Sequence, residues 1–373
     1  MTTKINKNNF FLEIFTSSGI AVSGIIVFFS FLVATLLLLI IGRNPAGMYQ
    51  AILQVVTGFD SRRGTWNVRY IGEWLAVSVP LVLCALSMGF AARSGLFNIG
   101  AEGQYIAGLT AAQFIAFSFP QIPVLHITAA MLGAMAAGAA WGALVGFLKV
   151  RYKVSEVVAT IMMNYIALFL HRIITLRIPG GNSFRTPDFP ATVSLSSSML
   201  ASMTNSSRLN YGFWFAIAAV FIYWVILEKT TLGYSLCAVG FNREAARYSG
   251  MNVNANIIAA MTIAGAFAGL AGASVSLGIF THGRVLSSFD NYGFEAIAVA
   301  LGGNCTAAGI AVMGLLFGML KSAQPLMQSR QIPMEIATII MGLVVVFISL
   351  RQGIRLFIEW RMRVKWNSFL SSQ

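Results

Sequence analysis

The stretch RSGLFNIGAEGQ, residues 93 to 104, interrupts an otherwise apolar tract with three glycines and the polar side chains of Arg93, Asn98, Glu102 and Gln104. Glycine allows the chain to reverse or unwind at low cost. Asn98 is suited to be the N-cap of a following helix, and Glu102 would lie in the first turn of that helix, where the dipole favours a negative charge. The stretch therefore predicts a tight junction between two helices, with Arg93 at the end of the first.

The composition of the whole chain is that of an integral membrane protein. Of its 373 residues, 57% are hydrophobic and 10% are charged, whereas soluble domains are about one quarter charged. The net charge of +13 then falls mainly in loops and tails, where it indicates orientation and contact with lipid headgroups. We therefore expect the lipid bilayer as a partner, and no nucleic acid.

The apolar segments predict the fold class. A helix that crosses a bilayer needs about 20 mostly apolar residues, and ten segments reach or approach this length. The eighth is too short to cross alone, so we expect it to form a broken, partly re-entrant pair with the ninth. The fold is thus all-α, a polytopic bundle of about ten transmembrane helices in a single domain, residues 1–373. The segments are 18–42, 74–92, 99–119, 124–148, 156–176, 211–227, 254–280, 292–303, 306–323 and 334–350.

Ten crossings place both termini on one side of the membrane. Basic residues are concentrated in the short loops and flanks of that side, for example at 149–153 and 351–365, which identifies it as cytoplasmic by the positive-inside rule. The longer polar stretches 43–73 and 177–210 then face outward, as connectors or as a docking rim, and the second has the composition of an irregular loop. The halves are also compatible with an inverted repeat.

Small residues recur at four-residue spacing within three of these segments. Such spacing lets helix backbones approach closely where lipid supplies no hydrophobic drive for association. The sequence therefore predicts close helix pairs at Gly138, Gly142 and Gly146, at Gly265 and Gly269, and at Gly314 and Gly318.

Several chemistries have no motif in this sequence. There is no GxxxxGK[ST] phosphate loop, no GxSxG or GxGxxG, no HExxH and no close carboxylate pair, and each of these would mark a catalytic or cofactor site. The three cysteines are far apart and form no CxxC pair. We therefore expect no catalytic residue, no metal and no cofactor.

Polar side chains inside apolar segments are the candidates for a solute pathway. An acid near the bilayer centre costs about 2.5 kcal/mol or more, so such groups normally face the bundle interior. The equally open alternative is hydrogen bonding between helices, worth about 0.6 kcal/mol per contact, and for Glu102 an ion pair with Arg93. The candidates are Asn98, Glu102, Gln104, Asn164, Glu295 and Asn304.

The loop 228–253 predicts one short helix in the stretch GFNREAARYSGMN. Asn242 is its N-cap, Glu244 lies in its first turn, and Gly250 ends it. A helix of about two turns is too short to be stable alone, so it needs a surface to lie on. Its small Ala245 and Ala246 offer little apolar area to lipid and favour a groove in another protein over the membrane surface.

Five stretches together resemble the permeases of ABC importers for branched-chain amino acids, ribose and nucleosides, and most of all the nucleoside branch. The first, ARSGLFNIGAEGQYIAG, is similar to the RxGLxNIGxEGQ signature of that family. The others are VSEVVATIMMNYIAL (154–168), TTLGYSLCAVGFNREAARYSGMNV (230–253), AGAFAGLAGASVSLG (264–278) and YGFEAIAVALGG (292–303). The resemblance runs in the correct order over nearly the whole chain from about residue 70. A departure is NCTAAG, residues 304–309, where many nucleoside-type relatives have RNHPxG.

The resemblance implies a permease subunit that imports a nucleoside and leaves ATP hydrolysis to a separate cytoplasmic ATPase. A second permease chain and an extracytoplasmic solute-binding protein or lipoprotein would complete the importer. The alternatives are a simple sugar or a flavin as solute, an ion-gradient transporter working through Glu102 and Glu295, or a membrane scaffold. The loop 228–253 would be the coupling helix that meets the ATPase, and its candidate coupling residues are Asn242, Arg243, Glu244, Ala245, Ala246 and Gly250.

Overall fold

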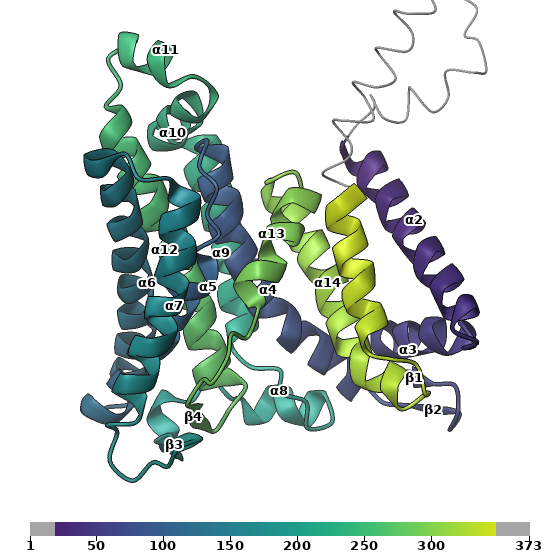
Figure 1. Ribbon diagram of the computed structural model, residues 1–373. Helices are drawn as coiled ribbons and strands as arrows, with labels where there is room; N and C mark the ends of the chain where they lie inside the picture. The colour runs from purple at the N-terminus through teal and green to yellow at the C-terminus, as the bar shows by residue number, and fades with distance from the viewer. Residues whose placement is uncertain (1–18, 348–373) are drawn as a thin grey trace, which may run out of the picture.

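The computed structural model describes residues 19–347, which form a helical bundle with polar elements gathered at its two ends (Figure 1). Helices α10 and α11 lie at one end, and α3, α8 and the short strands lie at the other. The helices are α2 (Gly19–Ile40), α3 (Ala46–Thr57), α4 (Arg69–Arg93), α5 (Ala101–Ser118), α6 (Leu125–Tyr152), α7 (Glu156–Thr175), η2 (Ala191–Val193), α8 (Ser198–Met203), α9 (Gly212–Lys229), α10 (Thr231–Phe241), α11 (Arg243–Tyr248), α12 (Val253–Gly278), α13 (Tyr292–Gly302), α14 (Ala307–Gln328) and an unlabelled helix Glu335–Phe347.

Six of the described helices are long and apolar enough to cross a membrane: α4, α6, α7, α9, α12 and α14. The apolar helices Ile26–Ile40, Thr231–Phe241, Tyr292–Gly302 and Glu335–Phe347 are shorter within the described residues. The polytopic helical bundle is therefore confirmed, while the total of ten crossings stays a prediction. The location of the two termini concerns residues outside the described range.

The eighth apolar segment forms only the 11-residue helix α13. At 1.5 Å per residue it is about 16 Å long, roughly half of a hydrocarbon core. The chain leads from β4 (His282–Arg284) to α13, as Figure 1 shows, and then turns into α14 through residues 303–306. Asn304 and Cys305 both have a φ of +52° in this turn. As predicted, the eighth segment is short and is followed at once by the ninth.

Helix α12 lies at the centre of the packing and contacts α4, α5 and α6. A Cβ added at Gly138 on α6 would collide with the backbone of Gly265 and Gly269 on α12, so these backbones touch. Gly314 and Gly318 on α14 also lie against α4, where an added Cβ would collide with the side chains of Val82 and Ser78. The predicted close approach at four-residue spacing is confirmed for both helix pairs.

Two small antiparallel sheets lie at the end of the bundle opposite α11 (Figure 1). Strand β1 (Phe59–Asp60) pairs with β2 (Thr65–Trp66), and β3 (Arg185–Asp188) pairs with β4. The second pairing ties the stretch 177–210 to the segment that leads into α13. This stretch also contains η2 and α8, so the expectation of an irregular loop was wrong: side-chain caps and strand pairing give it defined local structure.

We predict that Gly138→Leu destabilises the bundle. The added side chain would have to enter the α6–α12 contact, and overpacking of this kind costs about 1–3 kcal/mol. Thermal unfolding of the detergent-purified protein should show a midpoint lower by several degrees. Gly342→Leu is the matched control, because no described atom lies within 4 Å of a Cβ at that position. Equal midpoints for the two variants would contradict the close contact.

Candidate functional site

The junction predicted at residues 93–104 is present, but its capping differs from the prediction. Helix α5 has Gly100, not Asn98, at its N-cap position. The Asn98 side chain instead accepts a hydrogen bond from the Gly100 amide at 3.0 Å. This bond makes an Asx turn at residues 98–100, just before α5 begins. Gly95 adopts a φ of +70°, a conformation that glycine reaches without strain.

Three of the candidate pathway residues form closed, buried amide contacts. The Asn98 amide donates to Gln104 Oε1 at 3.0 Å and to Ser87 Oγ at 3.1 Å. Asn164 on α7 accepts from the Gly103 amide at 2.8 Å and donates to the Ile99 carbonyl at 3.1 Å. All of these side chains are buried. The contacts join α4, α5 and α7, which is the helix-joining alternative, and a place in a solute path stays a prediction for them.

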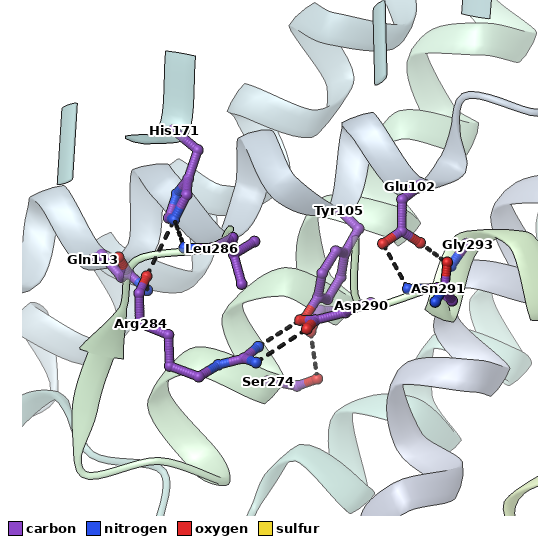
Figure 2. Close-up of polar contacts among 11 residues, drawn as sticks. Glu102, Tyr105, Gln113, His171, Ser274, Arg284, Leu286, Asp290, Asn291 and Gly293 are labelled. Carbon is purple, nitrogen blue, oxygen red and sulfur yellow. Dashed lines mark hydrogen bonds and ion pairs between the residues drawn. The ribbon is translucent and has the colours of Figure 1, made fainter. Parts of the chain in front are cut away.

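The Glu102 carboxylate binds backbone amides at the start of α13, as Figure 2 shows, and this contact is called the Glu102 clasp. Its two oxygens accept hydrogen bonds from the Asn291 amide at 2.9 Å and the Gly293 amide at 2.6 Å. The alternative ion pair between Arg93 and Glu102 is wrong, because Arg93 pairs with Glu228 at 3.4 Å. Glu102 does lie in the first turn of α5, as expected. Its charge therefore satisfies donors at the N-terminus of a second helix.

A second polar contact lies beside the Glu102 clasp. Asp290 accepts two hydrogen bonds from the Arg284 guanidinium, at 3.0 and 2.5 Å, and one from the Tyr105 hydroxyl at 2.8 Å (Figure 2). Burial acts to lower the pKa of Arg284, but the bond to Asp290 outweighs it, so this pKa lies above its usual value. The loop before α13 is thus fixed to α5 by side chains from both elements.

His171 on α7 fixes the same loop from the other side. Its Nε2 lies 3.1 Å from the Arg284 carbonyl and 3.2 Å from the Leu286 amide (Figure 2). Its Nδ1 lies 2.8 Å from the Thr110 hydroxyl. The imidazole is buried. Because the loop is held at residues 284–286 and again at 290–293, it presents its side chains in a defined arrangement.

A small cavity of about 160 Å³ opens beside this loop. Charged side chains on its wall have carboxylate partners, since Lys321 pairs with Glu295 at 2.7 Å and Arg208 with Glu73 at 2.7 Å. The candidate Glu295 is therefore next to the cavity, whereas Asn304 lies apart from it in the exposed turn between α13 and α14. The lining residues are Ala76, Val77, Arg208, Ile279, Phe280, Arg284, Asp290, Tyr292 and Lys321.

Sequence reasoning missed most of this wall. One available signal was Lys321, a lysine within the apolar segment 306–323, because intramembrane cations usually face the interior. Another was Asp290, an acid just before the segment that is too short to cross. Tyr105 carried no signal, since a tyrosine in an apolar helix is unremarkable without its partner.

The predicted coupling helix forms as expected. Asn242 caps α11, with its side chain accepting from the Ala245 amide at 3.0 Å, Glu244 lies in the first turn, and Gly250 follows the end with a φ of +81°. The aromatic side chains that flank the helix extend into solvent, Phe241 being 95% and Tyr248 92% exposed.

The two predicted alanines of α11 differ in their surroundings. Ala245 is exposed, whereas Ala246 is buried with only 4% of its surface accessible. A direct contact with another protein would therefore involve Ala245 and the flanking aromatics, while Ala246 holds the helix against its own chain. The assignment of α11 to a partner contact stays a proposal.

Helix α11 is also joined to the junction at the start of α5. The Arg243 guanidinium donates to the Gly95 carbonyl at 3.2 Å. The backbone of Gly240 lies so close to Gly95 that a Cβ on either residue would collide with the other. The loop 228–253 therefore rests directly on the RSGLFNIG turn.

We predict that Glu102→Ala loosens the start of α13. A hydrogen bond to a charged group contributes about 1.5–3 kcal/mol, so exchange of the amides at 291 and 293 should accelerate roughly ten- to hundredfold. Hydrogen–deuterium exchange of the protein in nanodiscs measures this. Glu244→Ala, which removes an exposed carboxylate from α11, is the control and should leave these amides unchanged. Unaltered protection in Glu102→Ala would show that the clasp does not hold the helix.

The chain is similar to known transporter proteins over most of its length. Residues 70–349 match the family described as branched-chain amino acid transport system, permease component. The guanosine ABC transporter permease protein NupP of Bacillus subtilis is 39% identical over 324 residues, which are 84% of this chain and 93% of that protein. The nucleoside ABC transporter permease protein NupB of Lactococcus lactis is 36% identical over 334 residues, 88% of this chain and 90% of that protein.

A glucose ABC transporter permease of Haloferax volcanii is more distant, at 32% identity over 74% of this chain and 75% of that protein. No solved structure matches the chain. The family match covers the junction, the Glu102 contact with α13, helix α11 and the cavity described above. The chain therefore belongs to this permease family, and it is a non-catalytic, multi-pass transmembrane component of an ABC transporter of the cell membrane.

Proposed function

We propose that this permease imports a nucleoside, with α11 as the contact through which a separate ATPase drives it. The observation that carries the proposal is the end of the molecule at α10 and α11, where Phe241 at the end of α10 and Tyr248 at the end of the capped helix α11 are almost completely exposed. Large exposed aromatics are typical of protein interfaces, where they fill pockets on the partner. Contact with the Gly95 turn gives this end a direct connection to the bundle.

The nucleoside is supported by relatives and by charge. The proteins similar at 39% and 36% identity are named for guanosine and nucleoside transport. Around the cavity, Arg208, Arg284 and Lys321 are each paired with a carboxylate. Paired charges leave little net field to attract an ionic solute, so the wall suits an uncharged polar solute.

The contacts suggest how motion at α11 would reach the cavity. Arg243 and Gly240 hold the turn at Gly95, that turn leads into α5, and Glu102 on α5 holds the start of α13. A displacement of α11 on ATP binding would therefore move α5 and α13 together. This is a contiguous set of packed and hydrogen-bonded groups, the kind of physical connection that can transmit such a change.

The proposed importer contains partners besides the ATPase. A second permease would complete the pore, and an extracytoplasmic binding protein would deliver the solute to the outward end. Bacillus subtilis has two guanosine ABC transporter permease proteins, NupP and NupQ, to which this chain is 39% and 31% identical. We therefore infer a heterodimer in which this chain takes the NupP-like position.

Uptake into vesicles tests the nucleoside assignment. The complete complex, reconstituted with its binding protein, should accumulate radiolabelled guanosine only when ATP is inside, and unlabelled adenosine should compete better than glucose or riboflavin. If only glucose or only riboflavin competes, the proposed solute is wrong, and the transported solute is a sugar or a flavin. Uptake driven by an ion gradient with the ATPase left out would contradict the coupling proposal.

We predict that Tyr248→Ser weakens the ATPase contact. Truncation of an aromatic anchor at the centre of an interface costs about 2 kcal/mol or more, so affinity should fall roughly thirtyfold and ATP-dependent uptake with it. Affinity is measured by titrating purified ATPase onto the permease in nanodiscs. Trp66→Ser, at an aromatic 71% exposed on β2, is the control at the opposite end. Equal affinities for both variants would remove α11 from the contact.

A further inference from the structure

We propose that the cavity beside α13 is a subsite for the sugar of the nucleoside and that Tyr292 reads one of its hydroxyl groups. The inference rests on the proposed function, since it presumes that the solute is a nucleoside. It adds the part of the solute that this chain recognises and the side chains that recognise it. The cavity lies within a single permease subunit, lined by α4, α14 and the loop before α13.

The size of the cavity fits a pentose and not a whole nucleoside. Pockets that enclose drug-sized ligands measure about 300–1,000 Å³, whereas this cavity measures about 160 Å³. We infer that a furanose ring with its hydroxyl groups occupies the cavity and that the base lies outside it.

Unused hydrogen-bonding capacity on the wall matches the needs of hydroxyl groups. The Tyr292 hydroxyl has no hydrogen-bond partner among residues 19–347, although its ring is held between Tyr105 and Lys321. A phenol can donate one hydrogen bond and accept others. The ring is therefore positioned by neighbours that leave its hydroxyl available to the cavity.

Two charged side chains retain capacity as well. Asp290 accepts three hydrogen bonds, and a carboxylate has about four acceptor sites. Lys321 donates to Glu295, and an ammonium group has three donors. A sugar hydroxyl, which both donates and accepts, can use the remaining acceptor of Asp290 and the remaining donors of Lys321.

The wall contributed by α4 adds a backbone acceptor. Proline has no amide proton, so Pro80 within α4 leaves the carbonyl of Ala76 without its helical donor. Ala76 lines the cavity. Ile279 and Phe280, which follow α12, supply apolar surface to the lining, which suits the carbon face of a furanose. The lining thus combines acceptors, donors and an apolar face, as sugar recognition requires.

The test compares guanosine with its 2′-, 3′- and 5′-deoxy analogues in the Tyr292→Phe variant of the reconstituted complex. A neutral hydrogen bond contributes about 0.5–1.5 kcal/mol, so guanosine uptake at low concentration should fall roughly two- to tenfold. For the one analogue that lacks the contacted hydroxyl, the variant and the wild-type complex should show equal uptake. In the double-mutant cycle both changes remove the same hydrogen bond, so the second change adds no further loss. The binding protein is the same in all measurements, so a changed ratio of analogue uptake to guanosine uptake arises in the permease.

Tyr211→Phe is the matched control, since it removes a phenol hydroxyl from the start of α9, which does not line the cavity. A second variant, Val77→Phe, fills the cavity and should abolish uptake while the ATPase still co-purifies. Unchanged guanosine uptake in Tyr292→Phe, or an equal loss for guanosine and all three analogues, would overturn the subsite. Absence of guanosine uptake by the wild-type complex would instead refute the proposed function.

Discussion

The Glu102 carboxylate holds the first amides of α13, and the arrangement of the cavity side depends on that contact. The first backbone donors of a helix have no acceptor within that helix, and a buried donor left without a partner is costly. One buried acid from α5 satisfies two of them. Asp290 and Tyr292 are sequence neighbours of Asn291 and Gly293, whose amides Glu102 binds. The same bonds therefore place both side chains at the cavity wall.

The junction at residues 93–104 has a double role that explains its polar composition. On one side, its glycine turn receives Gly240 and Arg243 from the loop that leads to α11. On the other, its polar side chains fasten α5 to α4, to α7 and to the start of α13. An apolar stretch could neither bond to these backbone groups nor turn so tightly. Polar residues inside the bundle therefore join α5 to α4, to α7 and to the start of α13.

Local and periodic features of the fold could be read from the sequence. Apolar length predicted the helices, four-residue glycine spacing predicted the α6–α12 contact, and Asn242 predicted the start of α11. These features depend on neighbours within a few residues, or on a helix face. The capping of α5 was misassigned because Asn98 and Gly100 are both good N-cap types, and only the backbone path distinguishes them.

The partners of Glu102 and Asp290 could not be predicted in the same way. Glu102 bonds to amides about 190 positions later, and a backbone amide leaves no mark in the sequence. Asp290 meets Tyr105 only because the loop before α13 folds back into the bundle. Such contacts follow from the packing of whole helices, which apolar length and periodicity do not determine.

The bare aromatics Phe241 and Tyr248 also bear on how the transporter is made. In the proposed complex the ATPase covers both rings. A subunit present without that ATPase would then expose them, and exposed apolar surface of this kind promotes aggregation and engages chaperones and proteases. Cells that make this subunit in excess of the proposed ATPase should therefore degrade the excess.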